Sequence, residues 1–184
     1  MKYENAQFTK NIRTVKLSDA QAILDIYAPY ITNTTVTFEY QVPSLEAFTK
    51  RIETISKEYP YLVWENDGKI LGYAYGSKYA EREAYRFSTD LSIYLCPDSH
   101  GKKIGTQLYS ILLDLLQKEG YRTLYAVISH PNLPSEGFHK ALGFEEFALF
   151  KKTGYKFGKW IDVLWMQKTI NPYDQNPILE KDKK

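Results

Sequence analysis

The stretch LSIYLCPDSHGKKIGT, residues 91–106, decides the fold of this chain. It starts inside a β-strand expected over 87–95 and continues after Pro97 into a loop that holds Gly101 and Gly105. A helix follows, because apolar side chains recur at helical spacing, namely Ile104, Leu108, Ile111, Leu112 and Leu115. Unpaired backbone N–H groups and the positive end of the helix dipole point into such a loop, which predicts an anion-binding site.

Two familiar phosphate-binding motifs do not fit this loop. A P-loop requires G-x-x-x-x-G-K-[ST], whereas the spacing from Gly101 to Gly105 is one residue short and Thr106 follows without an intervening Lys. A dinucleotide fingerprint requires G-x-G-x-x-G near the start of a βαβ unit, and this loop lies past the middle of the chain. A solvated turn that needs glycine only for its backbone stays open as the alternative.

Two helices and three strands are expected before this stretch. Ser18 and Gln21 have the spacing of a capping box at the start of an apolar helical face. A second helix is expected to begin at Ser44, directly after a proline. Strands are expected over 12–15, 61–65 and 69–76, and Asp67-Gly68 between the last two predicts a tight hairpin.

Three further strands are expected over 123–129, 145–152 and 161–168, with a short helix ending at Gly143. This order predicts an α+β fold in which a central mixed, mostly antiparallel β-sheet is flanked by helices on both faces. We expect a single domain over 12–170. Residues 1–11 are interpreted as a loose polar arm, and 171–184 as a C-terminal tail or dimer-contact arm.

Composition excludes several classes of protein. The chain has 184 residues and a formal net charge of +2, which argues against a broad nucleic-acid-binding surface. Cys96 is the single cysteine and the three histidines have no metal-ligand spacing, so we expect no disulfide within the chain and no metal site. Neither a signal peptide nor an apolar run of about 18 residues is visible, so no membrane span is expected and the cytoplasm is the default location.

The region around the quoted stretch resembles the GNAT superfamily of N-acetyltransferases. The resemblance rests on strand 92–97, loop 100–106, the following helix and strand, Asn132, and the segment 138–144. The superfamily binds acetyl-CoA with its pyrophosphate on a loop of pattern Gln/Arg-x-x-Gly-x-Gly/Ala. Here His100 stands at the Gln/Arg position, Lys103 stands at the first Gly position, and Gly105 matches the last position.

A narrower resemblance is to the phosphinothricin N-acetyltransferase branch, over roughly 12–168. It rests on the order and spacing of short segments: 34–38, 82–85, Tyr109, 126–128, 131–135, 139–144 and 154–163. It implies direct transfer of acetyl from acetyl-CoA to the amine of a small amino acid or analogue, of the phosphinothricin or methionine sulfoximine type. It also implies a homodimer.

The resemblance implies a role for each of several residues in holding acetyl-CoA. Backbone groups of Ile93, Tyr94 and Leu95 would pair with the pantetheine arm as an added strand, and an N–H near Ile93 would polarise the thioester carbonyl. The pyrophosphate would lie on backbone N–H groups of the loop, made by Gly101, Lys102, Lys103, Ile104, Gly105 and Thr106. Asn132 and Ser135 would contact the cofactor arm, although Asn132 read from sequence alone is a turn residue.

The same resemblance implies the catalytic and acceptor-binding residues. Asp90 stands where the family has a Glu and would be the general base, directly or through water; His139 would act as acid or base near neutral pH. Arg82 would bind acidic oxygens of the acceptor, Phe38 and Tyr85 would wall its pocket, and Trp160 would line it from the opposite subunit.

Purely structural roles stay open for these residues. Asp90 could cap a strand edge, His139 could be a structural histidine, Arg82 could form a surface ion pair, and Phe38 could be a core residue. For the whole chain, the alternatives are a GNAT enzyme acting on a polyamine, drug or protein N-terminus, or a non-catalytic acyl-CoA-binding module. Most of the 16 tyrosines are expected in the core.

Overall fold

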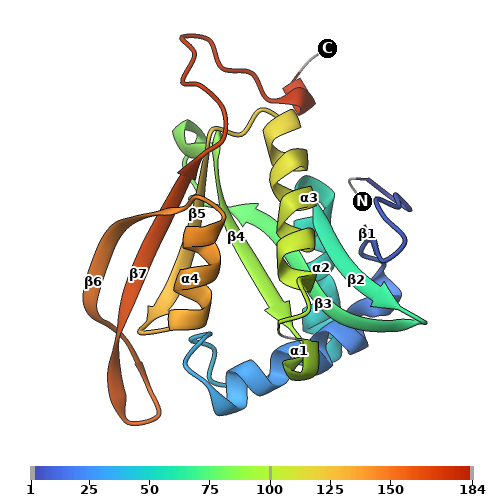
Figure 1. Cartoon of the computed structure of the whole chain (residues 1–184), viewed down its shortest axis with the longest axis vertical. Coiled ribbons are helices and arrows are strands. Elements are labelled where there is room, and N and C mark those ends of the chain that lie inside the picture. The colour runs from blue at the N-terminus through green and yellow to red at the C-terminus, as the bar shows by residue number, and fades with distance from the viewer. Residues whose placement is uncertain (1–2, 100, 183–184) are drawn as a thin grey trace.

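The computed structural model describes residues 3–99 and 101–182, and its centre is a seven-stranded sheet (Figure 1). The strand order is β1-β2-β3-β4-β5-β7-β6, and only β4 and β5 are parallel among neighbouring pairs. The strands are β1 (Ile12–Thr14), β2 (Tyr61–Asn66), β3 (Lys69–Lys78), β4 (Ser88–Leu95), β5 (Thr123–His130), β6 (Glu145–Lys156) and β7 (Lys159–Thr169). The predicted mixed, mostly antiparallel sheet is confirmed.

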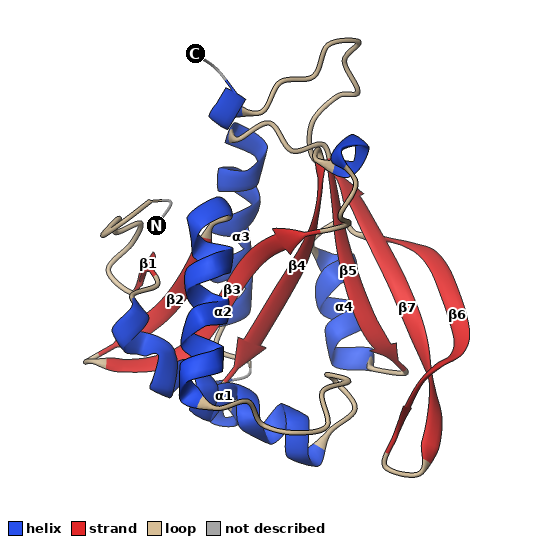
Figure 2. Cartoon of the chain, turned by 180° about the vertical axis from the view of Figure 1, so that it is seen from behind, coloured by secondary structure: helices blue, strands red, loops and turns tan. Residues whose placement is uncertain are grey.

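Helices cover both faces of this sheet, as predicted. They are α1 (Ala20–Asn33), α2 (Leu45–Glu58), α3 (Ile104–Lys118) and α4 (Leu133–Ala141), with single 3-10 turns at Leu17–Asp19, Glu83–Tyr85, Pro97–Ser99 and Glu180–Asp182. Figure 2 shows α1 and α2 on one face, with α3 and α4 on the other. Alternate strand residues serve the two cores: Val63 and Tyr73 pack toward α1, whereas Leu62 and Ala74 pack toward α3.

Local signals placed most element boundaries correctly. The Ser44 hydroxyl accepts from Ala47 N at 3.2 Å and begins α2. Asp67 and Gly68 both have positive φ, as a tight hairpin turn requires. The capping box predicted from Ser18 and Gln21 is wrong. A 3-10 turn precedes α1, and it is the Asp19 carboxylate that accepts from Lys16 N at 2.7 Å, because Asp19 is also held by an arginine on β1.

Both chain ends contact the rest of the domain over their described parts. In the first, Phe8 N donates to Ile12 O at 2.8 Å, and Phe8 lies against the larger core. In the second, Leu179 is 2% exposed within that core, and Glu180 N donates to Glu119 O at 2.9 Å. No helix in these described ranges is long and apolar enough to cross a bilayer.

The parallel pair positions the candidate site. β4 and β5 pair only over Ser88–Asp90 and Thr123–Tyr125, and then separate while each continues. From residue 91 onward, β4 keeps its antiparallel partner β3 on one edge, and its other edge pairs with no strand of the described chain. The two strands therefore form a V whose open end faces α4 and the start of α3 (Figure 1).

Candidate active site

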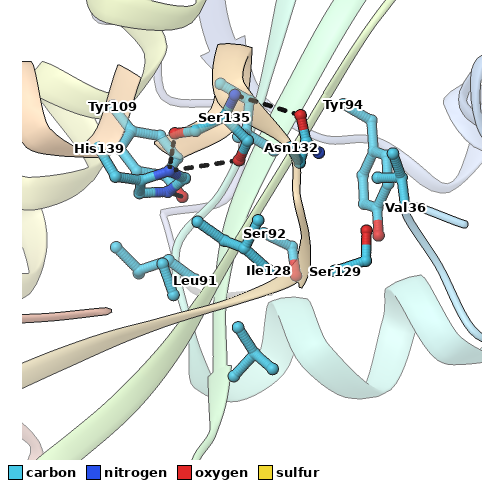
Figure 3. A pocket seen from close by; sticks show the side chains of 13 residues that line it. Val36, Leu91, Ser92, Tyr94, Tyr109, Ile128, Ser129, Asn132, Ser135 and His139 are labelled. Carbon is cyan, nitrogen blue, oxygen red and sulfur yellow. Dashed lines mark hydrogen bonds between the residues drawn. The ribbon is translucent and has the colours of Figure 1, made fainter. Parts of the chain in front are cut away.

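A cleft of about 420 Å³, partly open to solvent, fills the V between β4 and β5. Figure 3 shows Tyr109 and His139 on one side of it, and Val36 and Tyr94 on the other. The lining residues come from both strands, from α3 and α4, and from the segment after α1. They are Val36, Leu91, Ser92, Ile93, Tyr94, Tyr109, Ala126, Val127, Ile128, Ser129, Asn132, Ser135 and His139. Of the predicted cofactor residues, Ile93, Tyr94, Asn132 and Ser135 meet here.

The predicted anion loop lies between the end of β4 and the start of α3. Gly101 has a φ of +75°, and Lys103, the residue just before the helix, adopts the left-handed conformation with a φ of +60°. Gly105 brings the helix close to β4, since an added Cβ would lie 3.4 Å from Ile93. First-turn N–H groups of a helix have no partner within it, so this end can bind an anion. His100 lies outside the described residues.

Tyr109 and His139 form a buried hydrogen-bonded pair. The Tyr109 hydroxyl lies 3.1 Å from His139 Nε2, and His139 Nδ1 lies 2.8 Å from the Ser135 carbonyl oxygen. A carbonyl only accepts, so Nδ1 carries a proton, and in neutral His139 it is Nε2 that accepts from Tyr109. Burial lowers the pKa of His139, with the Ser135 contact opposing, and raises the pKa of Tyr109 well above its usual range.

Asn132 begins α4 and also lines the cleft. Its side-chain oxygen accepts from Ser135 N at 3.3 Å, and its own N–H donates to the buried carboxylate of Glu136 at 2.8 Å. Glu136 also lies 2.9 Å from His130 Nδ1. Two reciprocal hydrogen bonds therefore stabilise the start of α4. Asn132 caps this helix and also lines the cleft.

Asp90 lies at the point where β4 and β5 separate. Its neighbour Leu91 lines the cleft, and Asp90 shares a strand face with Ser92 and Tyr94 because strand residues alternate. Burial raises the pKa of the Asp90 carboxyl to about 7. Its buried Oδ1 has no hydrogen-bond partner among the residues that the structure describes. A carboxyl with these properties is suited to accept a proton near neutral pH.

The predicted acceptor residues lie outside this cleft within one chain. The Phe38 ring packs on Gly154 of β6. Arg82 and Tyr85 line a second cavity at the opposite end of β4, and Tyr85 contacts Tyr79, whose ring stacks 4.6 Å from that of Tyr125 on β5. Trp160 is 62% exposed on the β6–β7 hairpin. The structure thus brings four of the predicted cofactor residues into one cleft, whereas the four predicted acceptor residues lie at separate places outside it.

Several lining residues carried no predicted role, above all Tyr109 and Val36. Tyr109 belongs to the apolar face of α3 and is separated by 30 residues from its partner His139. Its periodicity indicates a core position, and only the packing of α4 onto the same sheet face reveals the pair. Among the described residues, no three His, Cys, Asp or Glu side chains gather as metal ligands.

A cleft between splayed parallel strands, with the start of a helix beside it, fits a protein that binds an extended phosphorylated ligand. The profile of the acetyltransferase (GNAT) domain matches residues 12–165. The chain belongs to the GNAT acetyltransferase family, which confirms the resemblance, and it is an acetyl-CoA-dependent N-acetyltransferase.

Individual relatives cover nearly the whole chain. A phosphinothricin N-acetyltransferase from Alcaligenes faecalis is 37% identical, over 93% of this chain and 88% of its own. An L-methionine sulfoximine/L-methionine sulfone acetyltransferase from Pseudomonas aeruginosa is 31% identical, over 91% and 98%. The crystal structure of a phosphinothricin acetyltransferase from Sinorhizobium meliloti in complex with acetyl-CoA is 36% identical, with a TM-score of 0.88 over 94% and 95% of the two chains.

Proposed function

We propose that the protein transfers acetyl from acetyl-CoA to the amine of a small amino acid or analogue, of the phosphinothricin or methionine sulfoximine type. The names of the relatives support this acceptor class. The observation that carries the proposal is the cleft between β4 and β5, together with the Asp90 carboxyl, whose buried Oδ1 lies on the residue at which the two strands separate. The proposed compartment is the cytoplasm.

Acetyl-CoA enters from the face of α3 and α4. Its pantetheine arm pairs with the free edge of β4 near Ile93, in the manner of an added strand, and an N–H there polarises the thioester carbonyl. The Leu95 carbonyl already accepts from the Tyr30 hydroxyl at 2.7 Å, so a contact at that residue shares this oxygen. N–H groups at the start of α3 hold the pyrophosphate. Asn132 and Ser135 lie beside the pantetheine arm on the β5 side.

Asp90 takes the proton that the attacking amine loses. The amine nitrogen forms a bond to the thioester carbon, the C–S bond breaks, and the amine proton passes to the Asp90 carboxylate or to a water beside it. The pKa of about 7 suits this exchange, because the carboxylate is both populated and basic near neutral pH. Its unpartnered Oδ1 supports the role, since no hydrogen bond must break first.

His139 is the acid assigned to the departing thiolate: its protonated form gives one proton to the sulfur and returns to the neutral form, in which Nε2 accepts from Tyr109. The Tyr109 hydroxyl and His139 both line the cleft on the face assigned to acetyl-CoA. Because the Ser135 carbonyl fixes the His139 tautomer, the hydroxyl has one defined partner and orientation.

The acceptor enters from the opposite face. Arg82 is the fork donor assigned to its acidic oxygens, and Phe38 and Tyr85 are its apolar walls. The row of Tyr85, Tyr79 and Tyr125 supports this placement, because Tyr125 lies opposite Asp90 in the register of β4 and β5.

We also propose a homodimer, formed through β6 and the β6–β7 hairpin. β6 is an edge strand, and its apolar side chains Phe147, Phe150 and Tyr155 are exposed, as is Trp160 on β7. A monomer rarely exposes so many aromatic side chains on one edge. In the dimer, Trp160 reaches the acceptor site of the partner.

An acceptor panel tests the function. Purified protein is given acetyl-CoA with phosphinothricin, methionine sulfoximine, methionine sulfone, spermidine or an alanine-starting peptide, and CoA release is measured. We expect the first three to have the highest kcat/KM. A preference for spermidine or the peptide would move the acceptor to another class. Tight acetyl-CoA binding without turnover on any amine would indicate a binding module.

A further inference from the structure

The segment 34–40, between α1 and α2, forms the wall of the cleft opposite Tyr109 and His139. Val36 of this segment lines the cleft beside Tyr94 (Figure 3). The Tyr27 hydroxyl lies 2.8 Å from Thr37 Oγ1 and ties the segment to α1. The segment has no helix or strand of its own, so its position depends on such contacts.

Lys156, at the end of β6, holds the segment from the other side. Its side chain is almost fully buried, with the residue 2% exposed. Its Nζ donates to the Thr34 carbonyl at 2.9 Å and to the Thr37 carbonyl at 2.7 Å, 119 residues earlier in the sequence. We call these two hydrogen bonds the Lys156 clamp.

A distortion in β6 directs Lys156 to this place. β6 pairs with β7 at Phe150–Val163 and next at Gly154–Ile161, so three residues of β6 lie opposite one residue of β7. The single β7 residue opposite these three is Asp162. Its carboxylate accepts from Lys152 N at 2.8 Å and from Lys151 Nζ at 3.0 Å, and these contacts fix the bulge. Such a bulge redirects the strand beyond it.

Two more contacts join the hairpin and the segment. Gly154 lies under the Phe38 ring, and a Cβ at this position would collide with it. The Tyr40 hydroxyl donates to the Tyr155 carbonyl. Gly154 and Lys156 are both buried and alternate with an exposed Tyr155, so one face of the strand is devoted to the segment.

Burial of the Lys156 ammonium group costs free energy, because the charge loses its contact with water. Both acceptors of the clamp are neutral carbonyls, and burial lowers the pKa of Lys156, with Glu39 opposing. A methionine would fill the same space without desolvating a charge. What lysine adds is direction, because its N–H groups fix where two carbonyls of the segment lie.

We propose that Lys156 is a positioning residue, which through the clamp fixes segment 34–40 as a wall of the acceptor side of the cleft. This rests on the proposed function. The clamp sets the KM for the acceptor amine and leaves the KM for acetyl-CoA unchanged, since the acetyl-CoA contacts lie on β4, α3 and α4, on the other face.

The test compares Lys156→Met with Lys118→Met, at an exposed lysine in the last turn of α3, away from the hairpin. For Lys156→Met we expect the acceptor KM to rise about tenfold, with the acetyl-CoA KM within twofold, and amides of 34–40 to exchange with deuterium about tenfold faster. Lys118→Met should match the wild type in both KM values and in the exchange of 34–40. Lys156→Arg, which keeps the donors, should restore part of the protection.

Equal changes in both KM values, or unchanged exchange of 34–40 beside a lower melting temperature, would reduce Lys156 to a structural role and overturn the proposal. If Lys156→Met does not fold, Gly154→Ala displaces Phe38 from the same side and must give the same split between the two KM values. If the wild type acetylates none of the amines, the proposed function fails. Two measurements then still decide whether the clamp fixes this wall: deuterium exchange of the amides of 34–40, and acetyl-CoA binding by calorimetry, each in the wild type and in Lys156→Met.

Discussion

At the scale of single residues, a buried oxygen without a hydrogen-bond partner distinguishes Asp90 from the other carboxylates that the structure describes. Most acidic side chains here pair with a base, as Asp19 does with Arg13 and Glu39 with Arg51. The pKa of Asp90 is raised by burial alone. The folded state therefore holds its proton more tightly than the unfolded state, and Asp90 destabilises the fold increasingly from about pH 4 up to about pH 7.

Asp90→Asn tests the base. In the wild type, kcat/KM should rise as the pH passes about 7, where the carboxylate forms, and again near the pKa of the acceptor amine. The Asn variant should lose the lower rise and about 10²- to 10⁴-fold in kcat. It should also be more stable than the wild type at pH 8, by on the order of 2 kcal/mol, with the gap closing toward pH 4.

The control for this variant is Asp114→Asn, on the exposed surface of α3. It should leave both the pH profile and its plateau unchanged. Retention of the rise near pH 7 in Asp90→Asn would assign that titration to another group.

Lys103 provides a second test at the scale of one residue. It adopts a left-handed backbone at a position where glycine is typical of the family loop. Lys103→Gly should raise stability by about 1 kcal/mol, because relief of this strain exceeds the extra chain entropy of glycine. Thermal unfolding measures it. Lys102→Gly, at a residue without positive φ, should destabilise instead, and the same response from both would show that Lys103 is unstrained.

At the scale of elements, the tail after β7 completes the packing of α3. Asn171 Nδ2 donates to carbonyls at the end of this helix, and Arg122 pairs with Asp174 at 2.8 Å. Leu179 then enters the core beside α3. The tail therefore acts as a part of the domain, and α3, which carries the anion loop at its other end, depends on it.

Leu179→Ala should destabilise the protein by about 2–4 kcal/mol, because it removes buried methyl groups and leaves a cavity. The neighbouring Ile178 is 53% exposed, so Ile178→Ala should change the free energy of unfolding by less than about 0.5 kcal/mol. Urea denaturation of both variants measures the difference. Equal effects would mean that the tail is not anchored by Leu179 in solution.

At the scale of the whole molecule, the sheet separates two faces that the cleft connects. One face has α3 and α4, on the side that we propose for acetyl-CoA, and the other has α1, α2 and segment 34–40, on the side that we propose for the acceptor (Figures 1 and 2). Donor and acceptor can then meet at the apex without sharing an entrance. The exposed aromatic edge of β6 lies at the far end of the sheet from β1.

Trp160→Arg tests the dimer and the shared site together. Light scattering should show a dimer for the wild type and a monomer for the variant, because a charge at an apolar interface opposes association. The acceptor kcat/KM should fall roughly tenfold, with acetyl-CoA binding retained. Leu17→Arg, outside this edge, is the control. A monomeric wild type with full activity would contradict the proposal.

Much of the architecture was predictable because its signals are local. The Asp67-Gly68 turn, the Ser44 cap and the strand–loop–helix at 91–106 each depend on a few neighbouring residues. The prediction failed where a tertiary contact competes with a local signal. Arg13 on β1 holds the Asp19 carboxylate, and Asp19, not Ser18, accepts the backbone hydrogen bond before α1. Leu179 lies in the segment interpreted as a C-terminal tail or dimer-contact arm, and nothing nearby in sequence shows the core that it enters.

The sequence by itself determined the order of strands along the chain, because periodicity and turn chemistry depend on neighbouring residues. Its short motifs also carried the resemblance that implied the family and its acetyl donor. Only the tertiary structure decided where the strands part, that Tyr109 pairs with His139, and that Lys156 reaches the carbonyls of Thr34 and Thr37. Such contacts join groups 30 to 122 residues apart. Their geometry, and the burial that shifts the pKa of Asp90, arise only when the packed sheet excludes water.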